Sequence, residues 1–323
     1  MFTVGHERQK RFLQKAFLSG RIPSAFAFIG KEGIGKKLLA LEFAKGLLCG
    51  KEPFGCGECK TCKQVDKFIK DLRGGEIETY AYYTSDEGGK KHLSYLIGEH
   101  PDLAVVIPDG NQIKIDQIRD IQDFVFLKPL GSSKVVVIDD AGKMNPQAQN
   151  ALLKTLEEPP EGVLFILIST LKGELLPTIL SRCQVLEFKA LRGSQVEEIL
   201  LRLKVTVPKA LKEVLLAEGS LSALKLAQEE EISQLFTKLE NVKNLTFAEI
   251  IDLAENFEGM ETEVKETFLE LLEKFLAKKT IKGEIPLETY ERVERLIAET
   301  KRGLKRGVKG KLAMENILLT FKE

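Results

Sequence analysis

The chain alternates short, continuous apolar runs with longer segments in which apolar residues recur every three or four positions. The apolar runs lie within residues 24–29, 103–107, 134–138 and 162–170, and residues 184–188 form a further predicted strand of mixed character. Runs of this kind predict strands that are buried on both faces of a parallel sheet. Helices are predicted between them, over residues 38–48, 113–126 and 145–158. Because strands and helices alternate, we expect an α/β parallel-sheet domain over residues 1–190.

From residue 191 onward the strand pattern ends and only amphipathic helical patterns remain. Short patterns cover residues 194–203, 209–218 and 220–229, and they predict a small helical domain over residues 191–242. Longer patterns cover residues 247–257, 262–277, 287–301 and 312–321. They predict a second, all-helical domain over residues 243–323.

Two segments have a less specific pattern. Residues 71–99 contain two glycine pairs with three tyrosines between them, which indicates a hairpin or a mobile excursion. Tyrosines beside Lys90 and Lys91 could stack on nucleic-acid bases, but a surface hairpin is the favoured interpretation. Residues 301–311 include six basic residues and no acid. A solvated loop between two helices is favoured there over a phosphate contact.

Residues 30–37 form a glycine-rich loop between the first predicted strand and the helix after it, with the sequence Gly30-Lys31-Glu32-Gly33-Ile34-Gly35-Lys36-Lys37. In such a loop, backbone N–H groups and the helix N-terminus bind phosphate, and the lysine after the last glycine reaches the outer phosphates. A Ser or Thr normally comes next, because its hydroxyl binds Mg²⁺. Here the residue is Lys37, which cannot coordinate a cation. The loop therefore predicts a phosphate site that is disabled for metal-assisted chemistry.

Polar residues follow two of the central predicted strands. Asp139 and Asp140 end the run of residues 134–138. In nucleotide hydrolases the first acid holds Mg²⁺ and the second polarises the attacking water. The second acid is often Glu, and Asp140 is one methylene shorter, which reduces its reach as a base. Ser169 and Thr170 end the next strand, at the edge where ligands bind in open α/β sheets.

Four of the five cysteines lie together, with the spacing Cys49-x6-Cys56-x2-Cys59-x2-Cys62. Two-residue gaps allow successive thiolates to bind one ion, and Gly55 and Gly57 give the backbone the freedom to turn. Four thiolates without His predict a closed, tetrahedral, structural Zn²⁺ site. The two alternatives to a zinc site are an iron–sulfur cluster and a redox or disulfide role for the cysteines.

The composition restricts the number of domains and the kinds of partner, but it does not indicate a function. A length of 323 residues predicts two or three domains, and contents of 43% hydrophobic and 30% charged residues are typical of a soluble globular protein. Lys and Arg number 48, as do Asp and Glu, so net charge gives no sign of a polyanionic partner. No apolar segment is long enough to span a bilayer and no signal peptide begins the chain. We therefore expect the protein to be located in the cytoplasm and to have no membrane partner.

Taken together, these motifs resemble the bacterial DNA polymerase III clamp-loader family, which are AAA+ proteins with a helical lid and a C-terminal collar. The motifs that carry the resemblance are the loop at 30–37, the four cysteines, His100-Pro101-Asp102-Leu103, Ile138-Asp139-Asp140-Ala141, residues 150–160 (NALLKTLEEPP) and residues 176–183 (LPTILSRC). The resemblance implies an AAA+ P-loop domain with an inserted zinc knuckle (residues 49–62), a lid at 191–242 and a collar at 243–323.

Within the family the chain resembles the delta-prime branch more than the ATP-hydrolysing motor subunits. Lys37 replaces the Mg²⁺-holding hydroxyl, and Ser222 stands where an active subunit places an arginine that senses the γ-phosphate. The chain also ends soon after the last predicted helix, without the long tail of some motor subunits. These features imply a stator, within a DNA polymerase III holoenzyme, that has no ATPase of its own and does not bind ATP and Mg²⁺ productively.

The resemblance also implies roles for single residues and partners. Arg182, in the Ser181-Arg182-Cys183 turn, would act in trans as an arginine finger on the ATP site of a neighbouring motor subunit. Thr170 would take the γ-phosphate-sensing position and be idle. The implied partners are motor subunits and a delta-like subunit in a hetero-oligomeric ring, the sliding clamp, and primed DNA through the complex. The alternatives are an active AAA+ motor ATPase and a zinc-dependent nucleic-acid-binding module.

Overall fold

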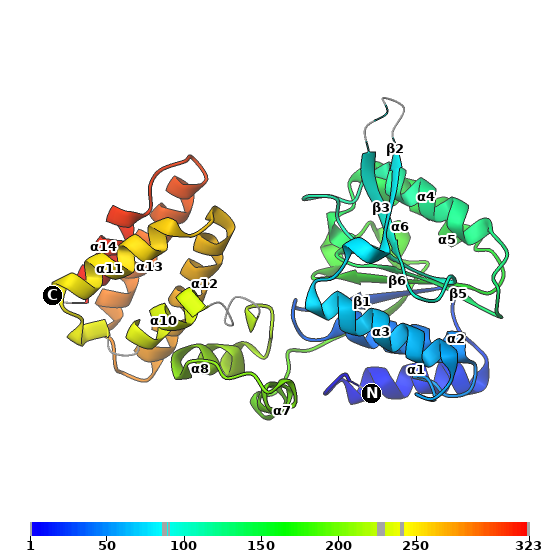
Figure 1. The fold of residues 1–323 in the computed structure, drawn as a ribbon, viewed down its shortest axis with the longest axis horizontal. Coiled ribbons are helices and arrows are strands. Elements are labelled where there is room, and N and C mark those ends of the chain that lie inside the picture. Colours follow the sequence, from blue (N-terminus) through cyan, green and yellow to red (C-terminus); the bar gives the residue numbers. More distant parts are fainter. Residues whose placement is uncertain (1, 86–88, 90, 225–229, 240–241, 322–323) are drawn as a thin grey trace. The chain divides into compact units, whose positions relative to one another are not determined.

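The computed structural model describes residues 2–85, 89, 91–224, 230–239 and 242–321. The chain forms two compact units, Met1–Ala190 and Leu191–Glu323 (Figure 1). The three-domain division, with a boundary between residues 242 and 243, stays a prediction. Within the described residues, none of the helices has the length and apolar character needed to cross a bilayer.

The first unit is built on one sheet. Over the residues that the structure describes, the sheet has seven strands in the order β2-β3-β4-β5-β6-β1-β7. Five are parallel: β4 (Leu103–Val106), β5 (Lys134–Ile138), β6 (Val163–Ser169), β1 (Ala25–Ile29) and β7 (Gln184–Glu187). In register, Ala25 pairs with Phe165 and Val135 pairs with Leu164. The parallel α/β sheet predicted from the apolar runs is confirmed.

One edge of the sheet differs from the prediction, because β2 (Ala81–Ser85) and β3 (Lys91–Ile97) are antiparallel to their neighbours. A short connection can join only antiparallel strands, so a hairpin here must add to the sheet in this way. The predicted hairpin is therefore confirmed, but the start of the segment is not part of it, because residues 71–74 end helix α3 (Lys60–Gly74). Gly88 and Lys90 lie outside the described residues.

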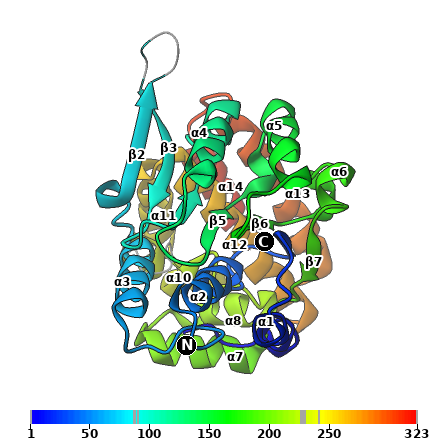
Figure 2. The ribbon, with the colours of Figure 1, turned by 90° about the vertical axis from the view of Figure 1, so that its right-hand side faces the viewer.

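Helices cover both faces of the sheet, as Figure 2 shows. The helices of this unit are α1 (Glu7–Ser19), α2 (Lys36–Cys49), α3, α4 (Ile115–Phe126), α5 (Pro146–Glu157) and the single-turn α6 (Pro177–Leu180). Helix α5 begins where Asn145 accepts a hydrogen bond from the Ala148 N–H at 2.8 Å and proline occupies the first turn. Helices α4 and α5 contact each other and lie on one face, and α2 and α3 contact each other on the opposite face.

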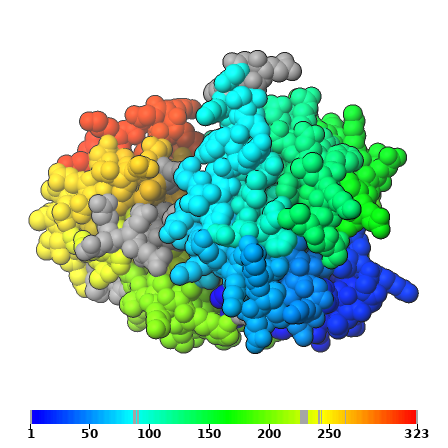
Figure 3. Space-filling model, turned by 45° about the vertical axis from the view of Figure 1, so that its right-hand side comes forward, coloured from blue at the N-terminus to red at the C-terminus, as the bar shows by residue number. Residues whose placement is uncertain are grey.

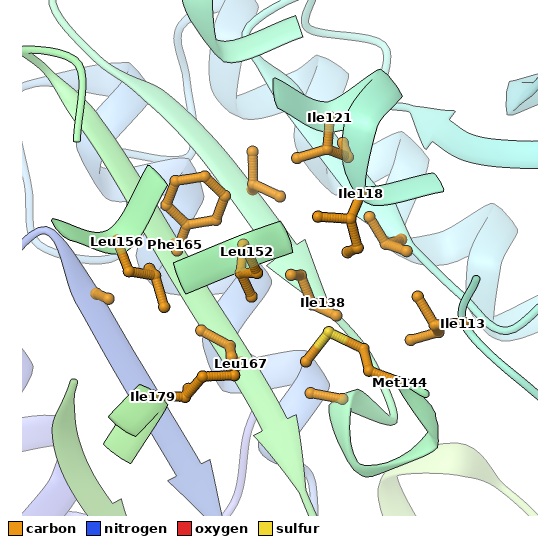
Figure 4. Close-up of a cluster of buried hydrophobic side chains, with 14 of the residues drawn as sticks. Ile113, Ile118, Ile121, Ile138, Met144, Leu152, Leu156, Phe165, Leu167 and Ile179 are labelled. Carbon is orange, nitrogen blue, oxygen red and sulfur yellow. The ribbon is translucent and has the colours of Figure 1, made fainter. Parts of the chain in front are cut away.

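The core on the α4 and α5 side explains the strand and helix patterns together. Alternate residues of the strands, such as Ile138, Phe165 and Leu167, point to this face and are buried (Figure 4). They pack against the apolar stripe of α4 and α5, which includes Ile118 and Leu152. The other residues of β5 and β6 are buried on the opposite face. Both faces are therefore covered, and this is why the strands are continuous apolar runs.

The second unit is helical. Its helices are α7 (Gly193–Leu203), α8 (Lys209–Glu218), α10 (Glu230–Leu239), α11 (Phe247–Gly259), α12 (Thr262–Ile281), α13 (Leu287–Leu304) and α14 (Lys311–Leu319). The sequence pattern did not predict α10. Residues 225–229 of the helix predicted over residues 220–229 lie outside the described residues. The basic segment 301–311 is only partly a loop, because α13 continues to Leu304, and Lys301 and Lys311 pair with Glu273 and Glu255 at 3.0 and 2.6 Å.

Candidate functional site

The glycine loop lies between β1 and α2. Gly33 and Gly35 have φ angles of 70° and 96°, which L side chains rarely adopt. A Cβ on Gly30 would lie 2.4 Å from the Phe188 carbonyl oxygen, so glycine is also required where the loop passes the end of β7. Ile34, between the glycines, is buried. The loop thus has the strand–turn–helix shape that the sequence predicted.

An N-terminal segment that the sequence analysis missed holds this loop. The His6 ring bonds through Nε2 to the Ile34 carbonyl at 2.7 Å, and burial lowers the pKa of His6. Glu42, fully buried on α2, accepts hydrogen bonds from the hydroxyl and the N–H of Thr3 at 2.5 and 3.3 Å. A buried acid on an otherwise apolar helix was the available sequence signal, because such an acid needs partners.

Lys36 is turned onto the loop itself. Its ammonium donates to the carbonyls of Gly30 and Lys31, the second at 2.7 Å, and the residue is 6% exposed. Burial lowers the pKa of Lys36, and the nearby Asp139 carboxylate acts in the opposite direction. The side chain is therefore at the centre of the loop, where a phosphate-binding lysine would be expected.

Lys37 makes a contact that the sequence did not predict. Its ammonium lies 2.8 Å from an oxygen of Asp139, at the end of β5. Asp140, the next residue, has a left-handed backbone with φ of 50° and pairs with Lys143 at 3.1 Å. Both acids of the predicted metal-binding pair are thus engaged by lysines. A Mg²⁺ ion requires near-octahedral oxygen ligands, so the residues present do not fit that ion.

Thr170 lies at the end of β6 and is exposed. Its N–H donates to the Glu174 carboxylate at 3.0 Å, and the same carboxylate accepts the Leu171 N–H at 3.1 Å and the Ser169 hydroxyl. Glu174, which the sequence analysis missed, therefore holds the backbone that follows β6. The signal was its position three residues after Leu171, where an acid can bond back to backbone N–H groups at the start of a helical turn.

Arg182 lies on the turn after α6, and its guanidinium contacts α5 and α6. It donates to the Thr178 carbonyl at 2.9 Å and pairs with Glu157, at the end of α5, at 2.6 Å. The two side chains are 34% and 49% exposed. The neighbouring Cys183 is packed against the core, and burial raises the pKa of its thiol to about 12. The turn is thus anchored by Cys183 and presents Arg182 at the surface.

The four clustered cysteines come together between α2 and α3. Their sulfur atoms all lie within 4.8 Å of one another, with Cys49 and Cys59 3.7 Å apart and Cys56 and Cys62 3.9 Å apart. Thiolates bound at 2.3 Å to one tetrahedral ion are about 3.8 Å apart, so these residues could hold a metal ion. Figure 3 shows light-blue residues, which belong to α3 and the segment before it, at the surface of the first unit.

The thiols of this cluster differ in their environments. Hydrogen bonds from the backbone N–H groups of Cys59 and Glu58 lower the pKa of Cys56 to about 6. Burial raises the pKa of Cys62 to about 12. Behind the cluster, the buried Lys45 pairs with Asp66 at 2.6 Å, which ties α2 to α3. Lys45 was not predicted to contribute.

A glycine loop between a strand and a helix, together with a buried strand that is followed by two acids, is typical of the class of P-loop proteins, and the sheet here has the α/β architecture of that class. A family model described as DNA polymerase III, delta subunit, matches residues 5–73 and 86–192. The chain therefore belongs to the DNA polymerase III delta subunit family, and the resemblance inferred from its motifs is confirmed.

Individual relatives agree with this assignment. The chain is 30% identical over 236 residues to DNA polymerase III subunit delta' of Bacillus subtilis, covering 72% of this chain and 62% of that protein. It is 37% identical over 173 residues to the delta' subunit of Pseudomonas aeruginosa, covering 51% and 44%. It is 34% identical over 199 residues to subunit tau/gamma of Haemophilus influenzae, covering 61% and 24%. The match thus spans less than two thirds of each relative.

Proposed function

We propose that the chain is a non-hydrolysing, stator-like delta-prime subunit of the DNA polymerase III clamp loader. It acts in the cytoplasm in a hetero-oligomeric ring with motor subunits and a delta-like subunit, and the ring loads the sliding clamp on primed DNA. Residues 191–242 serve as the lid and residues 243–323 as the collar. The observation that carries the proposal is Lys37, which occupies the metal-ligand position and pairs with Asp139.

Arg182 completes the ATP site of an adjacent motor subunit. Its pair with Glu157 is exposed, and exposed ion pairs contribute only about 0–1 kcal/mol. An arginine finger raises the rate of phosphoryl transfer by a factor of about 10³–10⁵, which corresponds to a barrier lower by roughly 4–7 kcal/mol. The guanidinium can therefore leave Glu157 for a partner's γ-phosphate at little cost.

The test is DNA-stimulated ATP hydrolysis by a reconstituted complex in which only the motor site next to this subunit is competent. Arg182→Ala is expected to lower turnover at that site by about 10³-fold without preventing assembly. Arg182→Lys retains the charge but loses the planar guanidinium, so it restores little. Glu157→Gln, which removes only the exposed partner, is expected to leave turnover at or above the wild-type value.

The matched control is Arg21→Ala, which removes an exposed arginine of the same unit. Normal assembly with unchanged turnover in the Arg182→Ala complex would overturn the arginine-finger role. The isolated chain gives a second criterion. If it hydrolyses ATP and Lys36→Ala abolishes that activity, it is a motor subunit instead.

The metal at the four cysteines is a structural Zn²⁺. The support is the all-thiolate donor set and the sulfur separations, which suit one tetrahedral ion. With all four ligands in use, no coordination position is left for catalysis. Elemental analysis of the purified chain is expected to give about one zinc per chain. Iron with acid-labile sulfide and visible absorption would identify an iron–sulfur cluster instead.

A further inference from the structure

Lys36 and Lys37, the last two residues of the glycine loop, are both engaged by the chain's own oxygen atoms. Lys36 donates to the carbonyls of Gly30 and Lys31. Lys37, one residue further into α2, pairs with Asp139 at 2.8 Å. The loop, the first turn of α2 and the end of β5 are thus connected through side chains of this chain alone.

The Lys37 contact joins the two positions that would hold a divalent cation in an active site. Residue 37 follows the loop lysine, where a hydroxyl ligand would stand, and Asp139 is the first acid after the central strand. An ammonium group brings one positive charge and three hydrogen-bond donors but offers no lone pair to a metal. The Lys37 ammonium therefore neutralises the Asp139 carboxylate and blocks the coordination of a metal ion by that carboxylate.

The burial of the two partners favours a stable pair. The Asp139 side chain is only 16% exposed, while the Lys37 side chain is 47% exposed. A half-exposed lysine loses little hydration, and its charge stabilises a carboxylate that is mostly shielded from water. Without the ammonium, Asp139 would need another cation.

We propose that Lys37 is an internal replacement for the divalent cation of this pocket, neutralising Asp139 and excluding Mg²⁺. The residue therefore determines metal specificity, and a Thr at position 37 would convert the pocket into a divalent-cation site. The inference deepens the proposal that the chain does not hydrolyse ATP and rests on it. It is independent of Arg182, because metal binding is measured on the isolated chain.

The experiment measures Mn²⁺ binding by electron paramagnetic resonance, since Mn²⁺ uses the same oxygen ligands as Mg²⁺. The proteins are loaded with zinc beforehand so that the cysteines are occupied. Lys37→Thr is expected to bind Mn²⁺ at least about tenfold more tightly than the wild type, because a positive charge is removed next to Asp139. Mg²⁺ should displace the bound Mn²⁺ from this variant.

Three variants make the outcome decisive. Lys37→Arg keeps the cation and is expected to bind Mn²⁺ as weakly as the wild type. Lys37→Thr combined with Asp139→Asn is expected to lose the gain, and Lys15→Thr, on an exposed position of α1, is expected to show none. The inference is overturned if the wild type already binds as tightly as Lys37→Thr. It is equally overturned if Lys37→Thr shows no gain, or if the gain survives in the double variant.

Discussion

Helix α2 has a motif typical of ligand binding at each end, and the two motifs differ in which ligand-donor residues they contain. Its N-terminus follows the glycine loop and its last residue is Cys49 of the cysteine cluster. Both motifs turn the backbone at glycines with positive φ, which are Gly33 and Gly35 at one end and Gly55 and Gly57 at the other. Their donor sets differ.

At the cysteine end all four donors are present and lie at separations that suit one ion. At the loop end one donor has been replaced, and the replacement fills the site, because Lys37 pairs with Asp139. We therefore expect the motif with a complete donor set to depend on a bound ion for its stability. A motif with an altered donor set can instead be stabilised by the chain itself.

The largest effect is expected from removing a donor at the cysteine end. Cys62→Ser removes a buried ligand of the cluster, and a structural metal contributes directly to folding free energy. We expect a loss of about 3 kcal/mol or more in the free energy of unfolding, measured by urea denaturation of the zinc-loaded protein. Chelation of the metal from the wild type should have a similar effect. A variant with wild-type stability would show that no metal stabilises this end.

A smaller effect is expected from Gly46→Ala, in the last part of α2. A Cβ there would lie 2.0 Å from the Pro53 carbonyl oxygen, so the chain leading to Cys56 would have to move. Overpacking of this kind costs about 1–3 kcal/mol, more than the helix gains from Ala. We expect lower stability and faster metal loss to a chelator, while the loop end is unaffected.

Gly74→Ala is the matched control for that substitution. Gly74 also ends a helix, α3, but a Cβ there would meet no atom within 4 Å. Its stability should equal or slightly exceed that of the wild type. If the two alanine variants lose metal at the same rate, the close contact at Gly46 does not hold the cluster.

The smallest effect is expected from Asp139→Asn at the loop end. The substitution removes the charge that Lys37 pairs with, but the Lys37 side chain is 47% exposed, so water can hydrate its ammonium group instead. We expect a loss of about 1 kcal/mol in the free energy of unfolding, with the metal content of the cysteines unchanged. A loss as large as that of Cys62→Ser would mean that the loop end depends on this pair far more than its exposure indicates.

Much of the first unit could be predicted from the sequence because its signals are local. A fully apolar run such as residues 134–138 indicates a strand covered on both faces, and β5 has those bounds. The hairpin at the sheet edge was predicted from its glycines, but its antiparallel pairing with β4 was not, because pairing depends on which strand is the neighbour. Helix α10 was missed, because the apolar pattern over residues 230–239 was not recognised as a helix separate from its neighbours.

The candidate sites were predicted in part. The residue types and spacing identified the loop, the acids and the cysteines. The partners of those residues were not found: Glu42, Glu157 and Glu174 are ordinary acids in the sequence, and each acquires its role from a residue that the fold brings near. The sequence signals at Glu42 and Glu174 do not identify the partner of either acid. Glu157 carries no such signal, because a carboxylate at a helix end is usually solvated.

By itself, the sequence determined the order of strand, loop and helix, the four thiolate donors, and the loss of a hydroxyl at position 37. Periodicity, glycine placement and side-chain chemistry are local properties that do not depend on the rest of the chain. Only the tertiary structure decided that Lys37 faces Asp139 and that Arg182 rests on Glu157. Such pairs join segments far apart in sequence, and their meeting depends on sheet order and helix packing, which no local pattern encodes.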